Sequence, residues 1–509
     1  MHFSAKGGAQ LTTQAPQDAL PSRDLLSELF PGARLIVATN RAPFRLKTGI
    51  GGQPIWERPA GGVTAALDPL LRQTGGLWVA AEPGNPQELR VPPEDPSYDV
   101  AVLGIPKEVY RGYYTGYANS GLWPLCHNLV ERAHFRSSDW TAYRQVNRQF
   151  AARIAAEARA TDLVWVHDYQ LALVPGYLRQ FGYTGPIAFF WHIPWPPTVV
   201  LRLVPERRLL LQGLLEADWI GFQTEESVDA FLAAAKRDLG ARSSRSSQGV
   251  TLHHQGHATR LASVPISIDV QHVEEIAMSD YTENLRERLQ RRWQLGPDQV
   301  LLLGVDRLDY TKGIPARLDG FARLLSRYPS LKGKVRFLQI AVPTRTEIQD
   351  YRRLAAAVRR RVTAINRSFG EPGWRPVRLI EHNLRLEQLV ALYRLADVAV
   401  VSSLYDGLNL VAKEYVAARI EGGGSLCLSE TAGAYHELRA AFPLSPLSSE
   451  RIAESMARAI FASPAERRER MAALRDAVRR NTVDTWLSRV LLGVRGSLDQ
   501  LSRLKETPV

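Results

Sequence analysis

The chain has 509 residues, of which 45% are hydrophobic, so we expect two or more packed domains rather than one core. No uninterrupted apolar stretch reaches the roughly 18 residues that a membrane-spanning helix needs, and residues 1–32 lack the apolar core of a signal peptide. The net charge of +12 comes with no zinc-finger spacing and no aromatic RNA-binding motif, so we expect neither a membrane nor a nucleic-acid partner.

Arginine-rich stretches account for much of the positive charge. Residues 352–367 and 467–480 alternate Arg with Ala, Leu and Val, as the solvated faces of amphipathic helices do. A basic cleft that attracts doubly anionic substrates explains the remaining positive charge better than nucleic-acid binding does.

Cysteine and acid spacing predict a protein without a resident metal. Cys126 and Cys427 lie far apart without ligand-like spacing, so we expect reduced core thiols in a cytoplasmic protein. No Asp-x-Asp pair and no His/Cys cluster occurs. We therefore expect no metal and no cofactor.

The predicted elements alternate between strand and helix. Residues 1–32, rich in Ala, Gln, Gly, Pro and Ser, are expected to form a mobile extension. Such alternation predicts an α/β fold whose parallel sheets carry helices on both faces. In the first half the predicted strands are residues 34–39, 77–80, 162–167, 186–191 and 260–265, and the predicted helices are 62–72 and 171–181.

The second half repeats this theme after a boundary near Ser267, Ile268 and Asp269. Domains are therefore expected at 33–268 and 269–480, facing each other across a cleft. The predicted strands are residues 300–305, 335–341, 377–381, 397–402 and 425–429, with a helix at 315–328.

Several side chains of the first half follow its strands. Gly62 closes a Gly-Gly turn that opens a helix, where free backbone N–H groups favour a ligand, although a plain tight turn is the alternative. Tyr114 and Trp123 offer aromatic surfaces for a sugar, or ordinary core residues. Asp168 ends a strand as a hydrogen-bond acceptor or a helix N-cap, and His192 ends the next strand, where a satisfied core group is the usual outcome.

Two cations follow the strand at 300–305. Arg307 and Lys312 are five residues apart, and such a pair can flank a diphosphate at the carboxyl end of a strand. The alternative pairs them with Asp306 and Asp309 as surface ion pairs.

Residues 406–414 carry an acid, a glycine-containing turn and a second acid after the strand at 397–402. The turn over Leu408, Asn409 and Leu410 exposes N–H groups at a helix start, which favours phosphate or sugar oxygens. Asp406 would meet sugar hydroxyls, and Glu414 would accept a ribose hydroxyl. The alternative is a capping Asp406 with Glu414 on a solvated face.

These motifs, together with residues 190–196 (FWHIPWP), resemble those of trehalose-6-phosphate synthases over residues 35–486. That family consists of retaining glycosyltransferases with two Rossmann-like domains (the GT-B type). The resemblance implies that residues 481–509 form a helical tail crossing back to the first domain. It also implies self-association into a homo-oligomer.

By the same resemblance, Gly62 contacts the donor phosphates and the His192 carbonyl lies near the C6 hydroxyl of the donor glucose. Arg41, Tyr114 and Arg345 bind the acceptor phosphate, beside Trp123, and Asp168 accepts acceptor hydroxyls.

The implied reaction moves glucose from a nucleoside-diphosphate glucose, expected to be UDP-glucose, to glucose 6-phosphate. Arg307 and Lys312 would stabilise the leaving diphosphate, which takes the acceptor proton on the same face, so no carboxylate pair is needed. Ala81 stands where the family often has Trp, which keeps two alternatives open. One is a glucosylglycerol-phosphate synthase using glycerol 3-phosphate, and the other is a catalytically silent sugar-phosphate sensor.

Overall fold

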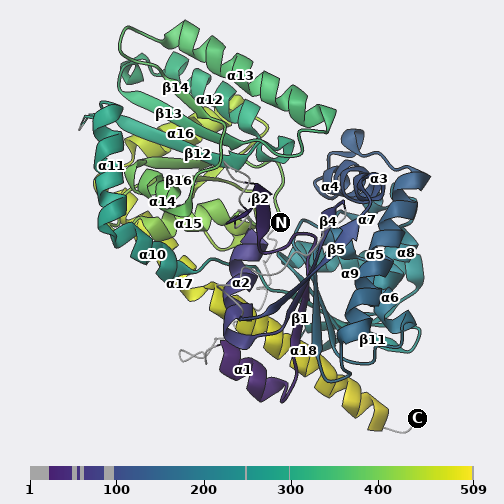
Figure 1. The fold of residues 1–509 in the computed structure, drawn as a ribbon. Coiled ribbons are helices and arrows are strands. Elements are labelled where there is room, and N and C mark those ends of the chain that lie inside the picture. Colours follow the sequence, from purple (N-terminus) through teal and green to yellow (C-terminus); the bar gives the residue numbers. More distant parts are fainter. Residues whose placement is uncertain are drawn as a thin grey trace, which may run out of the picture.

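The computed structural model describes residues 22–48, 54–57, 62–84, 97–246, 249–296 and 298–506. The chain forms two α/β halves, each built on one large, mainly parallel sheet, as the alternation of elements predicted. In Figure 1 the first half is blue to teal and the second half is green.

The first sheet has nine strands in the order β5-β4-β1-β6-β7-β8-β11-β10-β9. All pairs from β5 to β11 are parallel, and β10 pairs antiparallel with both β11 and β9. The polar strand β9 (RSSRS) lies at the edge, which is why no apolar run announced it. The strands are β1 Leu35–Ala38, β4 Leu77–Pro83, β5 Asp99–Ile105, β6 Leu163–His167, β7 Ile187–Trp191, β8 Trp219–Phe222, β9 Arg242–Ser246, β10 Gly249–His254 and β11 His257–Ser263.

The second sheet has six parallel strands in the order β14-β13-β12-β15-β16-β17. The strand order reverses between β12 and β15, and such switch points hold ligands in open α/β sheets. In the first sheet the order reverses between β1 and β6. The strands are β12 Val300–Arg307, β13 Val335–Val342, β14 Val377–Ile380, β15 Val398–Val401, β16 Ser425–Ser429 and β17 Phe442–Leu444; a separate hairpin joins β2 Arg45–Thr48 to β3 Pro54–Glu57.

Helices cover both faces of each sheet, because successive strand residues point to opposite sides. Ile36 packs in a hydrophobic cluster with Phe150 of α5, whereas Val37 packs in another cluster with Leu67 of α2. The helices are α1 Ser22–Leu29, α2 Gly62–Thr74, α3 Lys107–Tyr110, α4 Trp123–Cys126, α5 Ser137–Glu157, α6 Val174–Gln180, α7 Thr198–Leu201, α8 Arg207–Leu214, α9 Glu225–Leu239, α10 Val270–Met278, α11 Asp280–Arg292, α12 Ile314–Arg327, α13 Gln349–Phe369, α14 Leu386–Leu395, α15 Leu410–Ala418, α16 Ser449–Phe461, α17 Pro464–Arg480 and α18 Val483–Glu506.

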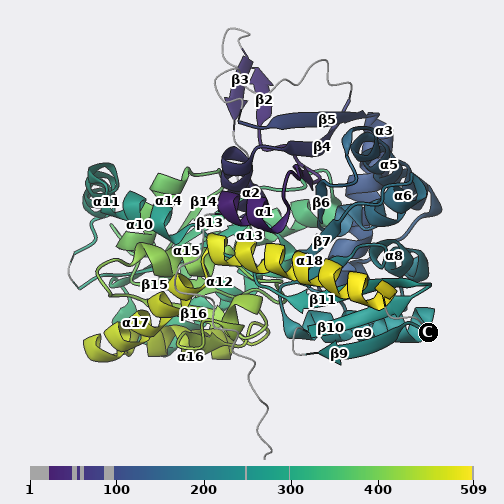
Figure 2. The same ribbon diagram turned by 90° about the horizontal axis from the view of Figure 1, so that it is seen from below.

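The last helix, α18, leaves the second half and runs along the first (Figure 2). Trp486 is 1% exposed, and its ring centroid lies 5.2 Å from that of Trp165 and 5.3 Å from that of Phe190. Arg495 donates to the carbonyl of Leu29 in α1 at 3.1 Å. The C-terminal helix therefore packs on the first sheet.

Two expectations need correction. Within the expected extension, residues 22–29 form α1, which buries Leu25 and Leu26, while residues 1–21 lie outside the described residues. The helix expected over residues 171–181 is split into a 3₁₀ turn, Tyr169–Leu171 (η3), and α6, with Pro175 in the first turn of α6.

Cys126 and Cys427 are free and buried, as predicted. Among the described residues, no helix is long and apolar enough to cross a membrane.

Candidate active site

The two switch points meet through contacts between the halves. A Cβ on Gly62 would lie 2.5 Å from Leu410 Cδ1, and one on Gly407 would lie 2.4 Å from the carbonyl oxygen of His192. Because the backbone oxygen of His192 cannot move aside, this approach requires glycine at position 407, whereas at position 62 the end of the Leu410 side chain would have to shift. Gly61, the other glycine of the predicted turn, lies outside the described residues.

Lys312 and Asp406 form the most buried charge pair of the predicted donor residues. Lys312 Nζ donates to Asp406 Oδ2 at 2.5 Å, and both side chains are almost fully buried. Asn409 Nδ2 donates to the same oxygen at 3.1 Å. Burial alone would raise the pKa of Asp406, but Lys312 and Asn409 hold it at about 2. Asp406 is thus a permanent anion that fixes Lys312 in place.

Arg307, at the end of β12, is exposed, and its side chain makes no hydrogen bond or ion pair with the described residues. Its guanidinium lies 5.5 Å from the centroid of the Trp123 ring. The alternative surface pairing is not found: Asp306 pairs with Arg317 at 2.5 Å, and Asp309 pairs with Arg345 at 3.3 Å. Arg307 therefore remains available to a ligand from solvent.

Arg41 and Tyr114 form a pair at the end of β1. Arg41 Nη2 donates to the Tyr114 hydroxyl at 2.9 Å. Burial would raise the pKa of the Tyr114 phenol, but the positive charges of Arg41, Arg345 and Arg307 lower it. The hydroxyl thus lies in the combined field of three arginines, one from the first half and two from the second.

A long π-helix, Arg111–Leu122 (η1), carries Tyr114 and leads directly into Trp123 of α4. π-Helices are rare, and the π-helical segments that do occur are frequently found at functional sites. The sequence pattern did not predict it. The Trp123 ring is 6% exposed and lies 4.1 Å from the Arg345 guanidinium, so Trp123 contacts both Arg307 and Arg345.

Asp168 follows β6 with a positive φ of 74°. Its Oδ1 accepts the backbone N–H of His192 at 3.2 Å, and its side chain makes no helix-capping bond to η3. Burial raises the pKa of Asp168 to about 7, against the lowering effect of backbone N–H groups of Tyr169 and His192. A carboxyl poised in this way suits hydrogen bonding to a sugar hydroxyl.

The His192 ring is satisfied within the protein. Its Nε2 lies 3.0 Å from His167 Nδ1, and its Nδ1 lies 3.3 Å from Gln223 Nε2. Burial lowers the pKa of His192 to about 3, so the ring is neutral at neutral pH. Only the backbone carbonyl, facing Gly407, points toward the second half.

The loop before α15 has two further features. Asn409 has φ 93° and caps α15 through Oδ1, which accepts the Ala412 N–H at 3.2 Å. Leu408 is 4% exposed and its carbonyl accepts the Ala434 N–H at 2.8 Å, so its side chain belongs to the core. The helix cap, which was the alternative role for Asp406, is made by Asn409 instead.

Glu414 lies one turn into α15 and is half-buried rather than on a solvated face. Its Oε2 accepts the Tyr393 hydroxyl at 2.8 Å. Burial raises the pKa of Glu414, while the bond from Tyr393 lowers it. Ala81 is 2% exposed and packs in the core of the first half.

A pocket with a volume of about 200 Å³ lies between the halves beside Asp406. Residues of the first half and of the second line it together: Pro194, Thr224, Glu226, Ser227, Tyr405, Asp406, Gly407, Glu430, Thr431, Gly433 and His436. Its position next to the Lys312–Asp406 pair marks it as part of the same crevice.

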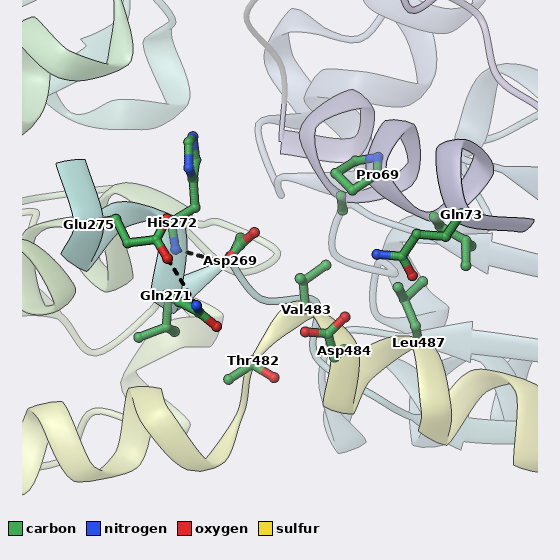
Figure 3. A pocket seen from close by; sticks show the side chains of 13 residues that line it. Pro69, Gln73, Asp269, Gln271, His272, Glu275, Thr482, Val483, Asp484 and Leu487 are labelled. Carbon is green, nitrogen blue, oxygen red and sulfur yellow. Dashed lines mark hydrogen bonds between the residues drawn. The ribbon is translucent and has the colours of Figure 1, made fainter. Parts of the chain in front are cut away.

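A larger pocket of about 430 Å³ lies elsewhere, where the chain crosses between the halves (Figure 3). It is enclosed by α2 and the first residues of α10 and α18, and Val483 N–H donates to the Ile268 carbonyl at 2.9 Å beside it. None of the predicted site residues lines it.

Sequence reasoning missed the side chains that hold the predicted ones in place. Asp309 was considered only as an ion-pair partner of Arg307 or Lys312, whereas it pairs with Arg345. Tyr351 bonds Arg345 at 2.5 Å, and no motif marked it. Tyr169, directly after Asp168, was the one such residue with a signal, because it follows a strand end.

Residues 33–494 match the family described as Glycosyltransferase family 20. The chain is 36% identical over 465 residues to a trehalose-6-phosphate synthase of Mycolicibacterium vanbaalenii, covering 89% of this chain and 94% of the relative. A trehalose-6-phosphate synthase of Mycobacterium avium is also 36% identical, over 461 residues, with 89% and 93% covered.

Solved structures with a similar fold come from the same kind of enzyme. An E. coli structure bound with UDP-2-fluoro glucose superposes with a TM-score of 0.82 at 30% identity, covering 91% of this chain and 99% of that one. A UDP-forming α,α-trehalose-phosphate synthase from Burkholderia xenovorans, in complex with glucose 6-phosphate, has a TM-score of 0.82 at 32% identity, with 93% and 100% covered.

Proposed function

Because the chain belongs to glycosyltransferase family 20, we propose that it transfers glucose from a nucleoside-diphosphate glucose to glucose 6-phosphate, forming α,α-trehalose 6-phosphate. It is similar over most of its length to synthases of that name and to structures bound with UDP-2-fluoro glucose or glucose 6-phosphate. UDP-glucose is the proposed donor.

One observation carries the proposal: cations from both halves gather around the crevice, which suits two phosphorylated substrates. Arg307 ends β12, and Lys312 lies in the turn that follows it, paired with Asp406; both cations are assigned to the leaving diphosphate. Arg41 and Arg345 surround the Tyr114 hydroxyl, as a sugar phosphate requires.

The proposed chemistry uses these cations rather than a nucleophile. As the bond between glucose and diphosphate breaks, negative charge grows on the phosphate oxygen, and Arg307 and Lys312 stabilise it. That oxygen takes the proton of the acceptor hydroxyl as the new bond forms on the same face, so the anomeric configuration is retained. Asp168 orients the acceptor hydroxyls, and the neutral His192 contributes its carbonyl.

The donor sugar contacts are assigned on the same basis. Asp406 and the N–H groups of residues 408–410 bind the glucose. Glu414 accepts a ribose hydroxyl, and Gly62 contacts the diphosphate. Asn409 and Leu410 begin α15, whose dipole favours an anion there.

The remaining assignments follow from the family and the sequence. We propose a first domain at 33–268 that binds the acceptor, a second at 269–480 that binds the donor, and a tail at 481–509. The reaction is proposed to need no metal or cofactor, and the protein to work as a cytoplasmic homo-oligomer. Its proposed partners are the two small-molecule substrates.

Product identification tests the proposal. The protein is incubated with labelled UDP-glucose and either glucose 6-phosphate or glycerol 3-phosphate, and the phosphorylated products are separated. Labelled trehalose 6-phosphate is the expected product. If only glycerol 3-phosphate is glucosylated, the acceptor assignment is wrong; if sugar phosphate binds without turnover, the protein is a sensor.

A further inference from the structure

Arg345 is anchored by two side chains on one side of its guanidinium. Its Nη1 donates to the Tyr351 hydroxyl at 2.5 Å and to Asp309 Oδ2 at 3.3 Å. The Tyr351 hydroxyl in turn donates to the same Asp309 oxygen at 3.2 Å. The three groups form a closed triangle, all of it buried or nearly so.

Asp309 is itself fixed at its other oxygen. Oδ1 accepts both the N–H and the hydroxyl of Thr311, each at 3.1 Å. Thr311 lies in the 3₁₀ turn Tyr310–Lys312 (η4), which also carries Lys312. The triangle is therefore hydrogen-bonded to the same turn that carries Lys312, the cation assigned to the donor diphosphate.

The other side of the guanidinium reaches the first half. Nη2 donates to the Tyr169 hydroxyl at 3.3 Å, and that hydroxyl donates to Asn119 Oδ1 at 2.7 Å. The plane of the group covers the Trp123 ring at 4.1 Å. Arg345 is thus held between the two halves, on a backbone with φ 48° that a non-glycine residue rarely adopts.

A guanidinium has five N–H donors, and the described contacts do not use all of them. Nη1 donates two hydrogen bonds and Nη2 donates one. Nε is buried and has no hydrogen-bond partner among the described residues. Buried donors are nearly always satisfied, and for Nε, which lies beside the crevice, a ligand oxygen would be such a partner. Nε and the second Nη2 hydrogen remain for an anion.

We propose that Tyr351 and Asp309 are positioning residues, which occupy Nη1 of Arg345 so that Nε and Nη2 face the acceptor phosphate. This inference rests on the proposed function. Neither residue touches substrate. Without the Tyr351 hydroxyl, the guanidinium is free to turn toward Asp309, and the geometry of phosphate binding is lost while the charge remains.

Tyr351→Phe tests this, with Tyr183→Phe as the control. Tyr183 also donates a buried bond, at 2.5 Å to the Asp162 carbonyl, but lies outside the site. For Tyr351→Phe, kcat/KM with glucose 6-phosphate should fall about tenfold, the loss of one hydrogen bond to a charged group. The KM for UDP-glucose should stay unchanged, and so should kcat/KM with unphosphorylated glucose.

A role in folding alone would lower both kcat/KM values together, and an unchanged ratio between the two acceptors would overturn the inference. Where glucose turns over too slowly, calorimetric titration gives the same comparison: the Kd of glucose 6-phosphate rises about tenfold and that of UDP does not. Asp309→Asn is the second variant if Tyr351→Phe does not fold. A parent protein inactive with glucose 6-phosphate refutes the proposed function; an active parent with unaffected variants refutes only the positioning role.

Discussion

Lys312 and Arg41 belong to different substrates in this account, so their removal should change different kinetic constants. Lys312→Ala removes a charge needed only as the diphosphate leaves, and kcat should fall roughly 100-fold. Arg41→Ala removes a ground-state contact, and the acceptor KM should rise about tenfold with kcat nearly kept. Steady-state kinetics with each substrate varied would measure both.

Arg148→Ala serves as a control, because Arg148 contacts Phe181 outside the crevice. A change confined to donor KM in both site variants would contradict the assigned roles. Lys312→Ala also leaves Asp406 buried without its cation, so thermal unfolding should be recorded in parallel.

Asp168 predicts a pH dependence of stability. Its folded-state pKa of about 7 exceeds the roughly 3.9 of an unfolded aspartate. The stability contributed by the neutral carboxyl is therefore full below about pH 4 and is lost as pH rises through 7. Asp168→Asn has no such loss, so its Tm relative to the parent should be higher at pH 8 than at pH 5. An equal difference at both pH values would show that the carboxyl is not buried in this way.

Of the individual site residues, the sequence predicted mainly those that follow the ends of strands. Arg307, Lys312 and Asp406 were found because parallel strands bring their carboxyl ends to one edge. Tyr351 and Asn119 were not, because they lie within helices and reach Arg345 and Tyr169 only through tertiary packing. The pairing of Asp309 with Arg345 was not foreseen for the same reason, since only Arg307 and Lys312 were considered as its alternative partners.

Among the elements, α15 depends on an unusual cap. Asn409 has φ 93°, which favours glycine, yet its side chain supplies the capping bond to Ala412. Asn409→Gly should lose only the bond, whereas Asn409→Ala should lose the bond and add backbone strain. We expect Asn409→Ala to cost about 1 kcal/mol more than Asn409→Gly in free energy of unfolding.

Chemical denaturation of the two variants beside the parent would measure this difference. Equal costs would mean that the backbone at Asn409 is not strained. The same loop donates to Asp406, so donor KM should rise in both variants.

Elements with apolar runs were the predictable ones. β12 and β16 are buried strands with the expected positions, and the arginine-rich helices α13 and α17 were also found. β9, a polar strand at the edge of the sheet, was missed because it gives no burial signal. β10 was missed as well, although it is an inner strand with buried Val250, Thr251 and Leu252. The π-helix η1 has no sequence signature of its own. The prediction named only an aromatic side chain in this segment and no helix.

For the whole molecule, α18 should be a structural part of the first half. Trp486→Ala removes a ring packed on Trp165 and Phe190 and should cost about 3–5 kcal/mol in free energy of unfolding. Leu492→Ala, on the same helix but 49% exposed, should cost little. Thermal unfolding measures both. Similar losses from the two variants would mean that α18 is not anchored through its tryptophan.

The two-half architecture was predictable from alternation, whereas the contacts between the halves were not. No local pattern announces that Gly62 meets Leu410 or that Lys413 of α15 donates to the Ile266 carbonyl at 3.2 Å. Such contacts depend on how the halves are docked. They decide which of the candidate residues form one site.

A crystal structure of the protein with UDP and glucose 6-phosphate is the most direct test. We predict the diphosphate within hydrogen-bonding distance of Arg307 and Lys312, and the sugar phosphate on Arg41, Tyr114 and Arg345. A diphosphate bound away from both cations, with Lys312 Nζ still directed only to Asp406, would contradict the account.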